Sequence, residues 1–137
     1  MLNDEEAIQL TGESNLKQAG KSLLESGPKT VIIKQSARGS LLFDKGDCIS
    51  VPVYPDVDVK DPTGAGDSFA GGFLGYLASN EKQDLTEAVV CGSAVASYTV
   101  SEFSIDRLVT LTKEQIQMRS RKIFSIMMEN QTLVSRN

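Results

Sequence analysis

The sequence predicts an α/β domain in which a small sheet is layered against helices. Short β-branched and apolar runs are confined to residues 30–53, and helix-like segments precede and follow them. A strand–loop–helix junction at residues 57–66 then leads into a helical second half. Strands and helices in this order favour a layered α/β domain.

Length and composition are those of one globular domain with a real core. The 137 residues are 40% hydrophobic and 23% charged, and the formal net charge is −4. This acidic balance argues against nucleic acid as a partner. No apolar run approaches the roughly 18 residues of a membrane span, and the first residues do not resemble a signal peptide. We therefore expect a cytoplasmic protein with no membrane partner.

The sequence contains no histidine. This excludes a Ser-His-Asp triad, a His-ligated zinc site and imidazole acid–base catalysis. The two cysteines, Cys48 and Cys91, are far apart and lack the spacing of metal ligands. Any chemistry must therefore use carboxylates, hydroxyls, lysines, backbone amides or a bound metal.

The first 28 residues predict two helices. Asn3 or Asp4 can cap a short helix over residues 5–10. A second helix over residues 16–25 carries leucine and alanine on one stripe, and the Ser-Gly-Pro of residues 26–28 stops it.

Turn signals divide the next segment into strands. The β-branched run at its start is typical of a buried strand. Pro52 and Pro55 indicate that the last strand is short or lies at a sheet edge. The predicted strands are residues 30–33, 40–43 and 48–53, with turns at 37–39 and 44–47.

The chain after residue 61 predicts helices. Thr112 and Gln115 have the spacing of a capping box at the start of the last helix. The polar tail over residues 129–137 is expected to fray. The predicted helices are residues 64–78, 85–100 and 112–128.

Residues 61–73, Asp-Pro-Thr-Gly-Ala-Gly-Asp-Ser-Phe-Ala-Gly-Gly-Phe, carry the strongest chemical signal. Gly64, Ala65 and Gly66 are small and stand where a loop becomes a helix, so their amides can point at an anion. Asp67 follows in the first helical turn, where the helix dipole stabilises a carboxylate. Such a carboxylate can take a proton from an alcohol while the amides stabilise a transferring phosphoryl group. Tight strand–helix packing is the competing interpretation of the glycines alone.

This segment resembles the C-terminal signature of the pfkB/ribokinase family of carbohydrate kinases. The resemblance implies a ribokinase-like layered sheet with helices, of which residues 1–137 supply the C-terminal half: a partial sheet plus flanking helices. It also implies that Gly64, Ala65 and Gly66 form an anion hole. Asp67 is then the general base that deprotonates the acceptor hydroxyl as it attacks the γ-phosphate of ATP.

Asn3-Asp4-Glu5-Glu6 resembles the family's Asn-x-x-Glu motif. The resemblance implies that Asn3 and Glu6 organise Mg²⁺ and phosphate, mainly through water. An amide oxygen and a carboxylate one helical turn apart suit a hydrated Mg²⁺. An ordinary helix start has the same letters, and the position of the motif before the strands favours the functional interpretation.

Residues 34–40 resemble the family's Gly-x-x-Gly turn against the nucleotide. Gly39 matches the second glycine, whereas Ser36 stands where the first would be. The resemblance implies that Lys34, Ser36 and Gly39 bind the nucleotide, and a plain β-turn with solvated cations is the alternative.

Residues 91–97 resemble the small-residue helix that borders the adenine pocket, which implies that Gly92 and Ser93 are nucleotide neighbours. Close helix packing explains small residues equally well. Asp61 and Thr63 occupy the loop that binds a monovalent cation in some family members. Residues 100–104 depart from the family pattern at the second half of that site, so K⁺ binding stays open.

The expected function is ATP-dependent phosphoryl transfer to a sugar hydroxyl, with ATP and Mg²⁺ as cofactors. The family's N-terminal acceptor and lid portion is not found in these residues, so we expect pairing with a second copy or an N-terminal half, and little activity of the chain alone. A nucleoside (adenosine-like) kinase and a non-catalytic nucleotide-binding or interaction module are the alternatives. The absence of Gly-x-Gly-x-x-Gly argues against a dinucleotide-binding dehydrogenase.

Overall fold

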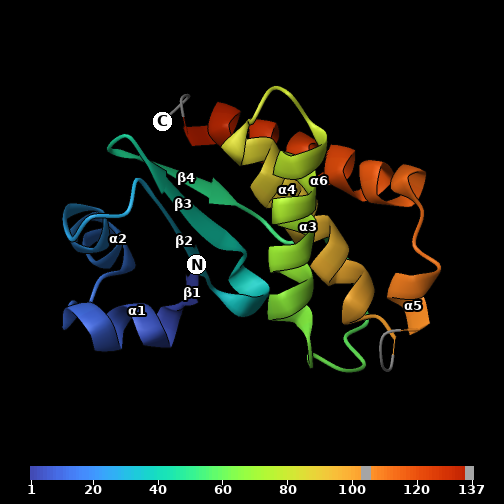
Figure 1. The fold of residues 1–137 in the computed structure, drawn as a ribbon, viewed down its shortest axis with the longest axis horizontal. Helices are drawn as coiled ribbons and strands as arrows, with labels where there is room; N and C mark the ends of the chain where they lie inside the picture. Colours follow the sequence, from blue (N-terminus) through green and yellow to red (C-terminus); the bar gives the residue numbers. More distant parts are fainter. Residues whose placement is uncertain (103–105, 135–137) are drawn as a thin grey trace. The chain divides into compact units, whose positions relative to one another are not determined.

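The computed structural model describes residues 1–102 and 106–134 (Figure 1). The chain divides into two compact units, Met1–Val51 and Pro52–Asn137. The sheet belongs to the first unit, and the described part of the second unit is helical. The predicted α/β class is confirmed.

The first unit holds a mixed four-stranded sheet in the order β1-β2-β3-β4. Strand β1 runs parallel to β2, whereas β2 and β3, and β3 and β4, pair antiparallel. The sheet edge predicted for the last strand is confirmed, but that strand ends at Val51 rather than at residue 53, because Pro52 has no N–H to donate to a ladder. The strands are β1 (Leu2–Asn3), β2 (Thr30–Lys34), β3 (Ser40–Asp44) and β4 (Asp47–Val51).

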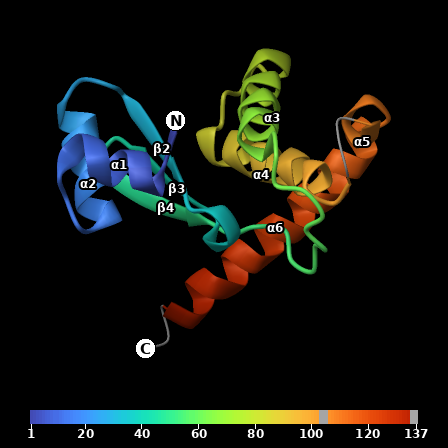
Figure 2. The same cartoon turned by 90° about the horizontal axis from the view of Figure 1, so that it is seen from below.

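Helices α1 (Asp4–Thr11) and α2 (Leu16–Glu25) lie on the same face of this sheet (Figure 2). Both predicted helices are confirmed, α2 with the predicted bounds. Gly12 ends α1 with a φ of 72°, a left-handed conformation that glycine adopts readily. The core under the two helices consists of alternate, same-face strand residues and two fully buried alanines: Ala7, Ala19, Val31, Ile33, Leu41 and Phe43.

The second unit contains α3 (Ala65–Ser79), α4 (Leu85–Thr99), α5 (Asp106–Val109) and α6 (Lys113–Val134). Helix α4 packs against α3 on one side and against α6 on another (Figures 1 and 2). The predicted capping box is confirmed: the Gln115 amide donates to Thr112 Oγ1 at 3.3 Å, and the Thr112 amide donates to Gln115 Oε1 at 3.0 Å. The short helix α5 was not predicted.

The prediction of a frayed tail from residue 129 is wrong as far as Val134, because α6 continues to that residue. No glycine or proline interrupts the sequence of α6, so its backbone hydrogen bonds can continue. Residues 135–137 lie outside the described residues.

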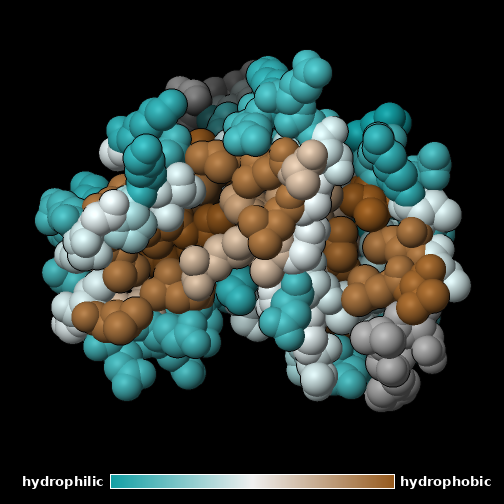
Figure 3. All heavy atoms as spheres, viewed as in Figure 1, coloured by the Kyte–Doolittle hydropathy of each residue, from teal (hydrophilic) through white to brown (hydrophobic). Residues whose placement is uncertain are grey.

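Hydrophobic residues are gathered over α3 and near α5 on the face shown in Figure 3. Leu74 is 58% exposed on α3 and Val109 is 78% exposed on α5, while Phe69 and Phe73 of α3 are buried. Among the described residues, none of the helices combines the length and hydropathy that a membrane span requires.

Gly20 of α2 lies against the Phe43 ring, and the absence of a side chain at Gly20 leaves room for that ring. A Cβ at Gly20 would lie 2.2 Å from Cζ of the Phe43 ring. We expect Gly20→Ala to destabilise the fold by about 1–3 kcal/mol through overpacking, although alanine is the better helix former. Urea unfolding followed by circular dichroism measures this change.

The matched control is Gly75→Ala in the interior of α3, where a Cβ would meet nothing within 4 Å. This variant should be neutral or more stable by up to about 1 kcal/mol. Equal stabilisation by both substitutions would contradict the packing assigned to Gly20.

Candidate functional site

The first turn of α3 begins at Gly64, which is its N-cap residue with a φ of 78°. The Ala65 amide donates to the Pro62 carbonyl oxygen at 3.2 Å, and the Ser68 amide donates to the Gly64 carbonyl oxygen at 2.9 Å. The amides of Gly66 and Asp67 lie in the first turn, where a helix offers no acceptor for them. An anion at this helix end would therefore rely on the amides of Gly66 and Asp67 before that of Ala65.

Asp67 is exposed and lines a hollow of about 610 Å³ beside the start of α3. The hollow brings together the loop before α3, the first two turns of α3 and the end of α4. Its walls are formed by Asp61, Thr63, Gly64, Asp67, Ser68, Gly71, Gly72, Val95, Thr99 and Leu108. The structure thus brings the predicted base and both residues of the predicted cation loop to one cavity.

The loop before α3 is held by two sets of hydrogen bonds. The Thr63 amide donates to Asp61 Oδ1 at 2.9 Å. The amides of Lys60 and Asp61 both donate to the Val100 carbonyl oxygen, at 2.8 and 3.3 Å. Hydrogen bonds from Thr63 hold the pKa of the Asp61 carboxyl below its ordinary value. Residues 100–104 differ in sequence from the family's pattern for the second half of the monovalent-cation site. Of these, residues 103–104 lie outside the described residues.

Gly92 and Ser93 are buried in α4. A Cβ at Gly92 would lie 2.7 Å from the Phe69 carbonyl oxygen, so glycine is required there for α3 and α4 to approach closely. Helix packing therefore accounts for Gly92, and the role of both residues as nucleotide neighbours stays a prediction.

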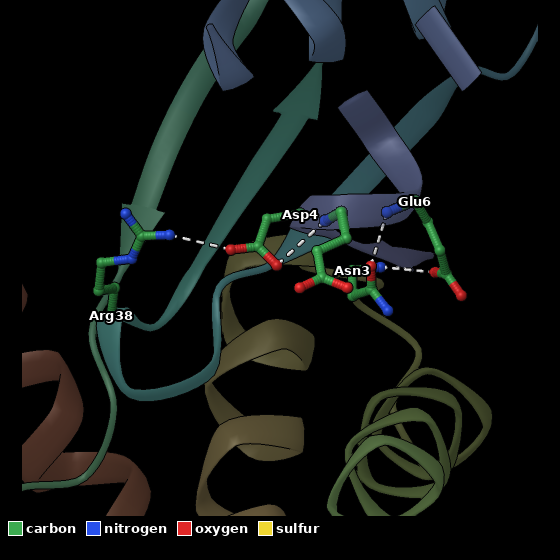
Figure 4. Close-up of polar contacts among 5 residues, drawn as sticks. Asn3, Asp4, Glu6 and Arg38 are labelled. Atoms are coloured by element: carbon green, nitrogen blue, oxygen red, sulfur yellow. Dashed lines mark hydrogen bonds and ion pairs between the residues drawn. The ribbon is translucent and has the colours of Figure 1, made fainter. Parts of the chain in front are cut away.

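Asn3 and Glu6 form a reciprocal capping box at the start of α1 (Figure 4). The Glu6 amide donates to Asn3 Oδ1 at 2.7 Å, and the Asn3 amide donates to Glu6 Oε2 at 2.8 Å. Both residues are exposed, and Glu6 Oε1 is not used by the box. Within the described ranges, His, Cys, Asp and Glu form no cluster of three suited to a metal ion. An amide oxygen and a carboxylate suit a hydrated Mg²⁺ held through water, and metal binding by this pair stays a prediction.

The turn after β2 is a 3₁₀ helix over Ser36–Arg38. Ser36 has a φ of 53° and Gly39 a φ of 87°, so the serine at the family's first glycine position adopts a conformation that favours glycine. The Gln35 amide donates to the Gly39 carbonyl oxygen at 2.7 Å and closes the turn. Lys34 is half-buried at the end of β2.

An ion pair that sequence reasoning missed links this turn to α1. Arg38 Nη2 lies 2.9 Å from Asp4 Oδ2, and Asp4 is the first residue of α1, next to Asn3 (Figure 4). The pair spans 34 positions of sequence, so no local pattern could have indicated it. It connects the predicted magnesium motif with the predicted nucleotide turn.

Comparison with known proteins defines the class. A family model described as pfkB family carbohydrate kinase matches residues 1–109, and the chain belongs to this family. The fold is accordingly a ribokinase-like α/β fold, of which this chain covers a part.

Individual relatives are kinases of small molecules. The chain is 31% identical over 112 residues to a ribokinase of Staphylococcus aureus, covering 81% of this chain and 36% of that protein. It is 40% identical over 77 residues to a cytidine kinase of Thermococcus kodakarensis, covering 54% of this chain and 27% of that protein. The chain thus spans about a third of the length of the curated relatives it matches.

Solved structures of two kinases also match this chain. A Salmonella enterica aminoimidazole riboside kinase, in complex with aminoimidazole riboside and an ATP analog, matches with a TM-score of 0.74 and 32% identity, over 87% of this chain and 40% of that chain. A ribokinase from Thermotoga maritima matches with a TM-score of 0.73 and 30% identity, over 87% and 40%.

The backbone of Ser36 generates a stability prediction. A non-glycine residue in the left-handed region costs about 1–2 kcal/mol, part of which is offset by the greater freedom of glycine in the unfolded chain. We expect Ser36→Gly to stabilise the fold by about 0.5–1 kcal/mol, measured by urea unfolding. Ala37→Gly is the control. Because Ala37 does not have a positive φ, this substitution should destabilise the fold. Stabilisation by the control alone would contradict the assignment.

The Asp61 turn generates a pH prediction. Because the folded-state pKa of Asp61 is lowered, the contribution of its carboxylate to stability is complete above the unfolded pKa and is lost as pH falls through the folded pKa. The pKa of the Asp61 carboxyl should lie below the ordinary value for an aspartate, and the Thr63 amide should shift with the same midpoint in NMR titration. A midpoint at or above the ordinary aspartate value, or a Thr63 amide that does not follow it, would contradict the turn.

Proposed function

We propose that this chain carries the nucleotide-binding and base-catalytic part of a kinase that transfers a phosphoryl group from ATP to a sugar hydroxyl. The main support for this proposal is that Asp67 lines one hollow together with Asp61, Thr63 and Gly64, at the first turn of α3. A carboxylate and helix-start amides at one cavity suit proton removal and phosphate stabilisation. Membership of the pfkB family supports the same reaction class.

In the proposed reaction Asp67 accepts the proton of the acceptor hydroxyl. The freed oxygen forms a bond to the γ-phosphorus, the bond from that phosphorus to the bridging oxygen breaks, and ADP leaves with the electron pair. Amides of the Gly64–Ala65–Gly66 segment stabilise the charge on the transferring group. A positioned base of this kind contributes about 10²–10⁴-fold to rate.

Other residues are assigned supporting roles. Asn3 and Glu6 would hold Mg²⁺ through water, and the ion would supply charge neutralisation at the phosphates. Lys34, Ser36 and Gly39 contact the nucleotide, as do Gly92 and Ser93. A monovalent cation such as K⁺ binds at Asp61 and Thr63.

The second candidate acceptor is a nucleoside. A cytidine kinase and an aminoimidazole riboside kinase are among the relatives, which favours a ribose or a riboside over other alcohols. Since the chain spans about a third of such relatives, we propose that it transfers phosphate efficiently only with an N-terminal half or a second copy. Alone it would act as a nucleotide-binding module.

Calorimetric titration with ATP–Mg²⁺ tests the proposal. We expect the wild-type chain and Asp67→Asn to bind with affinities within about 3-fold, because the base acts on the acceptor and not on the nucleotide. The control is Asp58→Asn, an exposed aspartate that does not line the hollow. Absence of binding by all three proteins would contradict a nucleotide site in this chain.

Turnover tests the role of Asp67 itself. In a longer form that phosphorylates ribose or cytidine, Asp67→Asn should lower kcat by at least about 100-fold and leave the Kd for ATP nearly unchanged. Retained turnover with lost ATP binding would contradict the assignment of the base.

A further inference from the structure

Arg119 of α6 is surrounded by a cluster that the proposed reaction does not use. Its Cζ atom lies 4.5 Å from the centroid of the Tyr54 ring and 3.5 Å from that of Tyr98. Its Nη1 donates a hydrogen bond to Ser97 Oγ at 2.8 Å. We name this cluster the arginine clamp; it consists of Arg119, Tyr54, Ser97 and Tyr98.

Among the described residues, no carboxylate pairs with the half-buried guanidinium of Arg119. The salt bridges of the described residues do not include Arg119, and its Nε atom is buried with no hydrogen-bond partner there. Aromatic faces are what stabilises the charge, since a guanidinium is weakly hydrated and stacks on rings. A lysine could not reproduce the planar contact together with the hydrogen bond to Ser97.

The clamp fastens the part of α4 that holds the loop before α3. Ser97 and Tyr98 lie in the last turn of α4, and the next residue, Thr99, lines the hollow beside Asp67. The Val100 carbonyl oxygen then accepts the amides of Lys60 and Asp61. The same loop begins near Tyr54, which the guanidinium also contacts. Arg119 therefore restrains the loop directly at its start and, through the end of α4, near Asp61.

We infer that Arg119 is a positioning residue for the candidate site, which fixes the loop over residues 54–64 and thereby the wall of the hollow that Asp67 shares. The expected effect on ATP binding rests on the proposed function, whereas the restraint on the loop does not. Helix α6 lies outside residues 1–109, which are the residues that the family model matches.

Amide hydrogen exchange of the 137-residue chain tests the positioning itself, without any ligand. In Arg119→Ala the amides of Lys60 and Asp61 should exchange at least about 10-fold faster relative to those of Val89 and Val90, which report opening of the α4 core. Arg119→Lys should show a smaller local change. Arg121→Ala, an exposed arginine of the same helix, should show none.

A uniform rise in exchange over all four amides would overturn the inference, because it would mean that Arg119 contributes only to global stability. Should Arg119→Ala fail to fold, Ser97→Ala carries the same comparison. It removes the Oγ that accepts the Nη1 hydrogen bond, together with the hydrogen bond that this Oγ donates to the Ala94 carbonyl oxygen within α4. Local loosening at Lys60 and Asp61 is again the expected result.

ATP–Mg²⁺ binding, measured well below the melting temperature, tests the consequence for the site. Arg119→Ala should bind at least about 5-fold more weakly than wild type, whereas Arg121→Ala should bind equally. Equal affinity of Arg119→Ala and wild type would overturn the role of the clamp at the site. A wild-type chain that binds no ATP, with the local exchange result intact, would contradict the proposed function and leave the loop positioning established.

Tyrosine emission gives an independent signature. The chain has no tryptophan and three tyrosines, two of which belong to the clamp. In a Tyr76→Phe background, emission reports the clamp alone, and ATP–Mg²⁺ should change it in proportion to site occupancy. Unchanged emission at saturating ATP would overturn the coupling between clamp and site.

Discussion

The closeness of α3 to α4 determines where Asp67 lies, and the candidate site depends on it. A Cβ at Gly92 would lie 2.7 Å from the Phe69 carbonyl oxygen, and one at Gly72 would lie 3.0 Å from Gly92 Cα. Because both positions are glycine, the two helix backbones touch where any other residue would separate them. Phe69 follows Asp67 by two residues, so this contact fixes the first turn of α3 above the hollow. The small residues of α4 thus place α3, the helix that carries the proposed base, whichever further contacts they make.

In the first unit, the residues predicted to hold Mg²⁺ also have a structural role. Asn3 and Glu6 cap α1 through their side chains and each other's backbone amides, yet both remain exposed. A cap of this kind holds two oxygen-bearing side chains one helical turn apart, which is compatible with the proposed role toward a hydrated cation. The ion pair between Asp4 and Arg38 adds a second restraint, since it ties this helix start to the turn after β2. The structure thus establishes the capping role of Asn3 and Glu6, and their role toward Mg²⁺ stays a proposal.

Local signals in the sequence were sufficient for most of the fold. The bounds of α2 follow from its stripe and the Ser-Gly-Pro stop. Strands β2, β3 and β4 follow from short β-branched or apolar runs between turns, whereas no such run indicates β1. The polar composition of residues 129–134 does not indicate that α6 extends to Val134, whereas the lack of glycine and proline permits it. The arginine clamp and the Asp4–Arg38 pair could not be predicted, because each joins residues far apart in sequence and follows no periodic pattern. The hydrogen bond from the Ala65 amide to the Pro62 carbonyl oxygen likewise depends on the geometry of one loop.

On the proposed function, ATP binds at the first turn of α3, beside Asp67. Backbone NMR of the 137-residue chain during titration with ATP–Mg²⁺ is the decisive test of this binding site. We expect saturable shifts at the amides of Gly64, Gly66 and Asp67, with smaller ones at Ser36 and Gly39. Shifts confined to other parts of the chain, or no saturable shift at these glycines, would contradict it.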